Sequence, residues 1–188
     1  MKNKIIYTFI ILIITAGTVF AQKNDYSREP GYVDFGDLSK YENGERVTEV
    51  MIESHLLKMV SKLAGKEDPD LKELLGGLKL IKVNAFEATD DNYEALKSLM
   101  EKTDKKLISE NWDRIVKTRS EDENANVYIK TDKDEIINGL VVIAVERDGD
   151  AAFVNIVGKI DLDQIGRLSE KFDIPELDKI KGGKHEKE

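Results

Sequence analysis

The 188-residue sequence contains no cysteine, only three prolines and only two histidines. The absence of cysteine excludes disulfides, thiol catalysis and thiolate metal ligands. Histidine chemistry is equally poorly supplied, because His185 lies in a charged tail and His55 follows Ser54 at a predicted helix start, with no triad-like partner at a suitable spacing. The fold must therefore be stabilised by its hydrophobic core alone.

Motifs that bind phosphate or carry a nucleophile are also missing. There is no Gly-x-Ser-x-Gly, and Gly76-Gly77 precedes a predicted strand, whereas an anion-binding glycine loop precedes a helix. Asp132 and Asp134 begin like a calcium loop but lack the glycine and the final glutamate that such a loop requires. The sequence predicts no catalytic residue, no metal site and no cofactor.

The N-terminus has the pattern of a secretory signal peptide. Lys2 and Lys4 precede an apolar run at residues 5–16, and Val19 and Ala21 occupy the two positions that signal peptidase reads. The run is shorter than the ~20 residues that cross a bilayer, so we expect cleavage near Ala21 and no stable membrane anchor afterwards. The predicted location is periplasmic or secreted.

The chain is acidic, with a formal net charge of −8. Cleavage after residue 21 would remove two lysines and no acidic residue, which leaves 27 basic and 37 acidic residues, a balance of −10. Such a charge makes nucleic acid and anionic lipid surfaces poor candidates as partners.

Two apolar runs joined by Asp148-Gly149 predict a β-hairpin over residues 138–160. A two-residue type I′ turn would fix the strand register, because it requires positive φ at both central residues. Three apolar pairs would then share one face, which we expect to be the core: Val141 with Ile156, Ile143 with Val154, and Val145 with Ala152.

The other face of the hairpin is more apolar than a solvent face should be. Together with a residue from an earlier strand, the candidate interaction face comprises Leu140, Val142, Phe153, Asn155, Val157 and Phe86. An apolar face that no helix covers is typical of a docking surface.

Hydrophobic periodicity predicts the remaining elements. Strands are expected over 47–53, 78–86, 112–118 and 126–131, and helices are expected to begin at Ser54, Asp68, Asp91 and Asp161. The apolar stripes are expected to be Leu56, Leu57, Val60, Leu63 and Ala64 in the first helix, Tyr93, Leu96, Met100 and Leu107 in the third, and Leu162, Ile165, Leu168 and Phe172 in the last. Val127 and Ile129 are expected to point inward from their strand.

These elements predict an α+β fold, a two-layer sandwich in which a mostly antiparallel sheet of about six strands has helices on one face. The predicted divisions are a signal peptide at 1–21, an extended N-terminal arm at 22–45, a single α+β domain at 46–178 and a disordered charged tail at 179–188.

Five stretches carry a resemblance to a known family. They are Gly-Tyr-Val-Asp-Phe-Gly at 31–36, Gly-Leu-Lys-Leu-Ile-Lys-Val at 77–83, Trp112, Phe-Val-Asn-Ile-Val-Gly at 153–158 and Phe-Asp-Ile-Pro-Glu-Leu at 172–177. Through them the chain resembles a bacterial family of exported proteins, domain-of-unknown-function family 4252. The resemblance implies an envelope location and an association with envelope-stress regulators, and it supplies no catalytic residue.

The leading hypothesis is a non-catalytic envelope protein that binds a partner, or a second copy of itself, through the candidate interaction face. One alternative is a carrier that holds a small apolar ligand between the helices and the sheet, in a closed cavity lined by Met59, Leu63, Met100 and the core face of the hairpin. A less favoured alternative is a hydrolase, which needs two carboxylates of shifted pKa converging in one cleft.

Overall fold

The computed structural model describes residues 25–42, 46–64 and 68–161. We call residues 25–42 the arm. The predicted signal peptide, the helix predicted after Asp161 and the charged tail lie outside the described residues. Within the described ranges, no helix combines the length and the apolar character needed to cross a membrane.

The elements alternate much as the sequence predicts. In chain order they are the 3-10 helix η1 (Ser39–Tyr41), β1 (Val47–Glu53), α2 (Ser54–Ala64), α3 (Pro69–Gly77), β2 (Leu78–Ala88), α4 (Asp90–Ser109), β3 (Asp113–Arg119), β4 (Glu123–Thr131), β5 (Ile137–Glu146) and β6 (Gly149–Ile160). Every strand and helix predicted within the described ranges is present.

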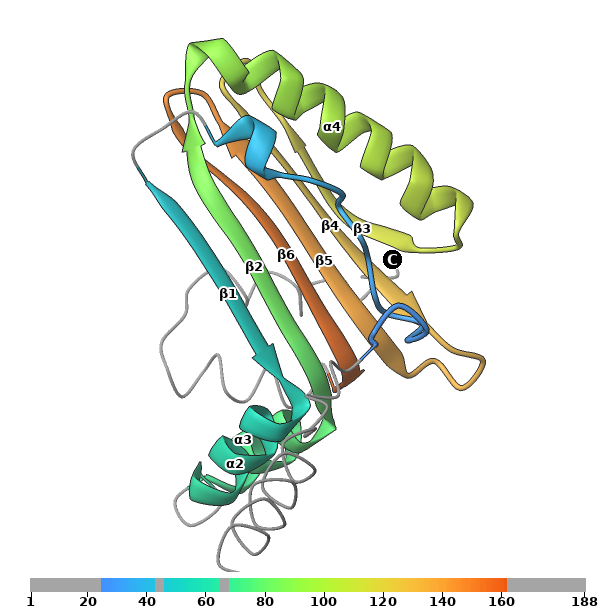
Figure 1. Ribbon diagram of the computed structural model, residues 1–188. Coiled ribbons are helices and arrows are strands. Elements are labelled where there is room, and N and C mark those ends of the chain that lie inside the picture. Colours follow the sequence, from blue (N-terminus) through green and yellow to red (C-terminus); the bar gives the residue numbers. More distant parts are fainter. Residues whose placement is uncertain (1–24, 43–45, 65–67, 162–188) are drawn as a thin grey trace, which may run out of the picture.

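The six strands form one antiparallel sheet in the order β1-β2-β6-β5-β4-β3 (Figure 1). The strands from β3 to β6 form a meander, in which each strand pairs with the next along the chain. At the centre of the sheet, β2 pairs with β6, which is far away in sequence, and this pairing joins the meander to the β1–β2 pair. With its helices this sheet makes an α+β sandwich, and the predicted fold class is confirmed.

The β5–β6 hairpin is present, but its register differs from the prediction by one residue. Positive φ occurs at Asp148 (55°) and not at Gly149, so the predicted type I′ turn is not formed. Ile143 therefore lies opposite Phe153 rather than opposite Val154. Because side chains alternate along a strand, a slip of one residue moves every β6 side chain to the other face.

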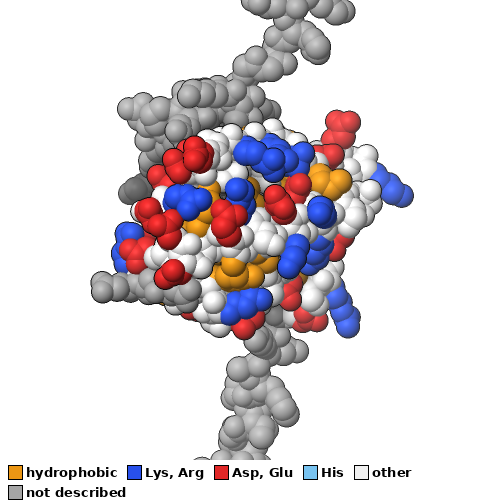
Figure 2. All heavy atoms as spheres, turned by 90° about the horizontal axis from the view of Figure 1, so that it is seen from above, with side chains coloured by type: hydrophobic (Ala, Val, Ile, Leu, Met, Phe, Trp, Pro, Cys, Tyr) orange, Lys and Arg blue, Asp and Glu red, His pale blue; other side chains and the backbone are white. Residues whose placement is uncertain are grey.

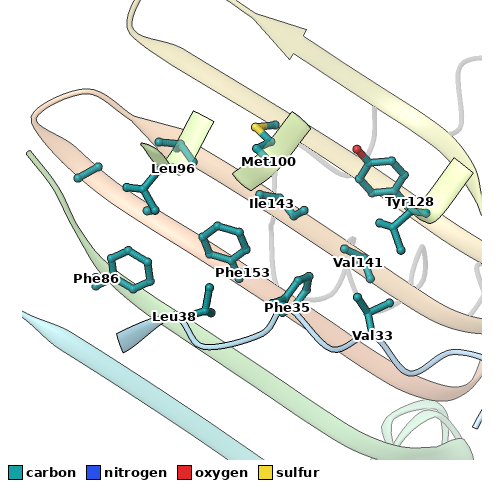
Figure 3. Close-up of a cluster of buried hydrophobic side chains, with 14 of the residues drawn as sticks. Val33, Phe35, Leu38, Phe86, Leu96, Met100, Tyr128, Val141, Ile143 and Phe153 are labelled. Carbon is teal, nitrogen blue, oxygen red and sulfur yellow. The ribbon is translucent and has the colours of Figure 1, made fainter. Parts of the chain in front are cut away.

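We define the inner face of the sheet as the face covered by α4 and the arm, and the outer face as the opposite one (Figure 1). On the inner face the Phe35 ring of the arm meets Phe153 edge-on at 5.5 Å between centroids, and Phe86 stacks on Phe153 at 6.1 Å (Figure 3). The apolar stripe predicted for α4 is confirmed, because Tyr93, Leu96, Met100 and Leu107 are all buried. This side of the sheet holds the larger part of the core.

The two short helices lie together at one end of the sheet (Figure 1). Leu57 of α2 is buried in a second apolar cluster with Leu78, Ile137 and Ile160, and Leu75 of α3 packs against it. Asp68 begins α3 by accepting a hydrogen bond from the Leu71 N–H at 3.1 Å, as its position before Pro69 predicts.

Candidate interaction surfaces

The structure does not bring the six residues of the predicted interaction face together. Phe86, Phe153, Asn155 and Val157 lie on the inner face and are at most 2% exposed, whereas Leu140 and Val142 lie partly buried on the outer face. The register slip separates the two groups, and the arm and α4 cover the first group. The prediction that these residues form one open docking face is corrected accordingly.

Asn155 joins the sheet to the arm. Its Oδ1 accepts a hydrogen bond from the Val33 N–H at 2.9 Å, and its Nδ2 donates to the Gly31 carbonyl at 2.9 Å. The side chain is completely buried, so these bonds satisfy backbone groups that water cannot reach. The one polar residue of the predicted face thus binds the chain's own arm.

Strand β4 also directs its side chains differently from the prediction. Asn126 and Tyr128 are buried toward α4, whereas Val127 and Ile129, which were expected to point inward, lie on the outer face and are partly buried. Polar side chains on this strand can be buried because α4 supplies a hydrogen-bond partner for Tyr128, described next.

A chain of hydrogen bonds connects α4 to β3 and β4. The Tyr128 hydroxyl and the Arg114 guanidinium both donate to Asp104 Oδ1, at 2.8 Å and 2.5 Å, and Asn126 Nδ2 donates to the Tyr128 oxygen at 2.8 Å. Burial disfavours the Asp104 carboxylate, but the two donors outweigh it and hold the pKa of Asp104 below its usual value. Burial and the neighbouring carboxylate raise the pKa of Tyr128.

The residues of the predicted ligand cavity do not meet. Met59 and Leu63 are 54% and 71% exposed on α2, whereas Met100 of α4 is buried in the inner-face cluster with Ile143 of the hairpin. The pocket that Met100 does line holds about 30 Å³, which is room for a water molecule rather than an organic ligand. The cavity assumed in the carrier hypothesis is therefore not formed by these residues.

The acidic residues that converge within the described ranges surround a cation. Asp90, Glu94 and Asp122 lie 2.9, 3.5 and 3.6 Å from the Arg147 guanidinium, which also sits 4.1 Å over the Tyr93 ring centre. All three carboxylates are largely exposed. In the part of the chain that the structure describes, no three histidine, aspartate or glutamate side chains are grouped as metal ligands would be.

The outer face is crossed by a row of six valines, one from each strand. In paired register they are Val50, Val83, Val154, Val142, Val127 and Val116. We call this set the valine row. None of its members belongs to either of the two buried clusters of the described residues, so the centre of the outer face is apolar and lies outside those two clusters.

The rows beside the valine row differ in side-chain size. Toward α2 and α3 lie Ile52, Ile81, Ile156, Leu140 and Ile129, and toward the hairpin tip lie Thr48, Ala85, Ala152, Ala144, Ala125 and Thr118. The large row packs against the cluster that contains Leu57. The outer face is therefore graded, from large side chains at one end to small side chains at the other.

Among the described helices and strands, α2 carries the largest number of exposed large apolar side chains. Leu56, Met59, Val60 and Leu63 are 38%, 54%, 44% and 71% exposed, and we call them the α2 stripe. Their spacing of i, i+3, i+4 and i+7 places them on one side of the helix. Of the predicted apolar stripe of α2, Leu56, Val60 and Leu63 are exposed, and the helix packs on the rest of the protein through Leu57.

The charge of α2 is opposite to that of the whole chain. The helix carries Lys58 and Lys62 and no acidic residue, in a protein whose net charge is −8. The end of the molecule seen in Figure 2 instead shows acidic and basic side chains interspersed, with small separate apolar patches. An apolar stripe beside lysines thus distinguishes α2 from that surface.

Comparison with known proteins places the chain in a family without assigning it an activity. No curated protein matches the chain, and no solved structure does. The family described as Domain of unknown function (DUF4252) matches residues 41–168, which include every strand of the sheet and helices α2 to α4. The stretches at 31–36 and 172–177 that also suggested this family lie outside the matched range. Because the match extends over more than half of the sequence, the chain belongs to the DUF4252 family.

Proposed function

We propose that this protein is a non-catalytic bacterial envelope protein that binds a partner protein through the α2 stripe. The exposure of the stripe carries the proposal. Its four large apolar side chains face water on one side of one helix, although the same helix has Leu57 fully packed. Adjacent exposed apolar residues of this kind mark interaction sites more often than isolated ones do.

The size of the stripe suits a reversible contact. Burying one such side chain completely from a fully exposed state is worth roughly 1.5–3 kcal/mol. The four are only 38–71% exposed, so burying the remainder supplies roughly 3–6 kcal/mol before the costs of association are subtracted. A micromolar complex needs about 8 kcal/mol net. The stripe therefore requires help from a polar rim, which Lys58 and Lys62 provide.

The charges favour an acidic partner over a second copy of the chain. Two α2 helices in contact would bring Lys58 and Lys62 of one copy near those of the other, and like charges at an interface are unfavourable. A partner with an apolar groove and acidic side chains at its edge would pair with both features of the helix.

The envelope location rests on the signal-peptide pattern of residues 1–21 and on the family resemblance. Export predicts that the mature chain begins near Gln22. N-terminal sequencing of the protein recovered from the envelope fraction tests this point, and a mature protein that still begins at Met1 would contradict it.

The docking site is tested by photo-crosslinking in intact cells. A photoreactive residue at Leu63 should give a discrete crosslinked product, whereas the same residue at Ile108, which is 47% exposed on α4, should not. Adding Met59→Asp should abolish the product, because the new carboxylate disrupts the apolar contact and repels an acidic partner. Equal products from Leu63 and Ile108, or none from Leu63, would contradict the proposal.

A further inference from the structure

Both edges of the sheet are open within the described residues. The strand order places β1 at one edge and β3 at the other, and no further strand of the described ranges pairs with the outer side of either. All seven residues of β3 are exposed, and so are four of the seven residues of β1. Each edge therefore presents backbone N–H and C=O groups to which another strand can add.

The two edge strands carry opposite charges. Strand β3 holds three basic residues and one acidic residue, a balance of +2, whereas β1 holds two glutamates and no basic residue, a balance of −2. Two β3 edges in contact, or two β1 edges, would bring like charges together, and like charges directly opposite each other destabilise a sheet. A β3 edge that meets the β1 edge of another copy brings opposite charges together instead.

The strand directions allow the sheet to continue from one copy into the next. The sheet has six strands, and each of them is antiparallel to its neighbours. Because the number of strands is even, β1 and β3 run in opposite directions. A second copy that is shifted sideways, with its inner face on the same side, therefore places its β1 antiparallel to the β3 of the first copy.

On the outer face, two side-chain rows end in the same residue type at both edges. The valine row ends in Val50 on β1 and in Val116 on β3, and the neighbouring row of small side chains ends in Thr48 and in Thr118. If Val116 of one copy lies opposite Val50 of the next, Thr118 lies opposite Thr48, and both rows continue across the junction. Directly opposed threonines are among the cross-strand pairs that stabilise a sheet.

The same register brings Lys117 opposite Glu49 on the inner face. Glu49 Oε1 accepts a hydrogen bond from Asn84 Nδ2 at 3.0 Å, which holds the carboxylate beside the β1 edge. Arg119 lies two residues beyond Lys117 and is therefore a diagonal neighbour of the same glutamate. A single register thus matches the side chains of the outer face and pairs the charges of the inner face.

The irregular part of β3 lies outside this register. Lysines and β-bulges often protect edge strands from pairing. The bulge of β3 lies between Arg114 and Val116, so residues 116–119 keep a regular register with β4, as residues 47–50 of β1 do with β2. These two stretches can therefore pair as regular strands, and the β3 lysine then meets a glutamate rather than a second lysine.

We infer that copies of this protein associate edge to edge, with β3 of one copy adding to β1 of the next. Such an interface is heterologous, so the assembly is an open filament, or a ring if the rotation between copies closes it. The contact between two strand edges is small, and we therefore expect weak, concentration-dependent association. The inference concerns a different surface from the α2 stripe, so it and the proposed function can fail separately.

Cysteine pairs test the register in the mature chain, residues 22–188, which has no native cysteine. A Thr48→Cys chain and a Thr118→Cys chain of different mass are mixed in equal amounts and oxidised mildly. Directly opposed residues have Cα atoms about 4.5–5.5 Å apart, a separation that suits a disulfide. We expect the mixed dimer to exceed the sum of the two homodimers, whereas random collision would make the two amounts equal. A Lys133→Cys chain, mixed with the Thr118→Cys chain, is the matched control and should give no excess.

Charge variants test the pairing on the inner face. Lys117→Glu in the Thr118→Cys chain should lower the yield of mixed dimer, because it places two glutamates opposite each other. Lys133→Glu makes the same change in net charge in the turn between β4 and β5, and it should leave the yield unchanged. Adding Glu49→Lys to the Thr48→Cys chain should restore the yield that Lys117→Glu removes.

Sedimentation velocity covers the case in which the cysteine variants fold poorly. The weight-average sedimentation coefficient of the unmodified mature chain should rise with concentration, and Lys117→Glu should reduce this rise while Lys133→Glu does not. An excess of either cysteine homodimer would overturn the inference in favour of a two-fold contact between like edges. A random yield of mixed dimer, or a chain that stays monomeric at every concentration, would overturn it as well.

Discussion

The hydrogen bonds of Asn155 give the sharpest test of how the arm is held. Asn155→Leu keeps the branching and the number of heavy atoms of the side chain but leaves the Val33 N–H and the Gly31 carbonyl buried without a partner. Each unsatisfied buried group costs roughly 1–3 kcal/mol. We therefore expect the free energy of unfolding to fall by about 2–6 kcal/mol, a large share of the 5–15 kcal/mol that is typical of a domain.

The assay combines urea unfolding with amide hydrogen exchange. The unfolding midpoint reports the total loss, and exchange at the Val33 N–H reports whether the arm opens locally. Asn138→Leu serves as the matched control, because Asn138 is only partly buried and its amide donates to Asp132 and to the Ile136 carbonyl. We expect the control to cost less than about 1 kcal/mol.

The result that would refute this reasoning is specific. If Asn155→Leu changed the free energy of unfolding by no more than the control, the amide would not be what holds the arm. The apolar contacts of Phe35 and Val33 would then account for its position.

Three further predictions concern other parts of the fold. Leu57→Ala should reduce the free energy of unfolding by about 2–5 kcal/mol, whereas Leu63→Ala should change it by about 0.5 kcal/mol or less; urea titration of both variants measures the difference. Because the pKa of Asp104 is lowered in the folded protein, its contribution to stability is complete above the unfolded pKa of about 3.9 and is lost as the pH falls below that value. Because the pKa of Tyr128 is raised, its contribution is complete below the unfolded pKa of about 10 and is lost as the pH rises above that value. Asp104→Asn should flatten the acid side of a stability–pH curve. Gly139→Ala should destabilise the protein by about 1–3 kcal/mol, because its new Cβ would lie 2.4 Å from the backbone of the arm; a normal melting temperature would contradict that contact.

Much of the fold follows from local signals in the sequence. Ser54 and Pro69 mark helix starts, and the Asp148-Gly149 pair marks a hairpin, because these residues favour caps and turns through their own backbone chemistry. The buried side of α4 is also predictable, because apolar residues that recur with a period of 3.6 define the side of a helix that packs on a sheet.

The side of α2 that packs on the rest of the protein could not be predicted from its sequence. Its periodicity shows that one side is apolar but not whether the rest of the chain reaches that side. The structure packs Leu57 and leaves Leu63 exposed. The distinction depends on where α3 and the end of the sheet lie, which no local pattern of α2 encodes.

The sequence alone determined which residues form strands, where the chain turns and that the protein depends on an apolar core. Only the tertiary structure decided which side of each strand faces that core. Phe153 and Val154 are both apolar, so the pattern of β6 is compatible with either orientation. The choice follows from distant partners, because Phe35, Phe86 and the arm's backbone at Val33 engage Phe153 and Asn155 on the inner face, and the strand register adjusts to those contacts.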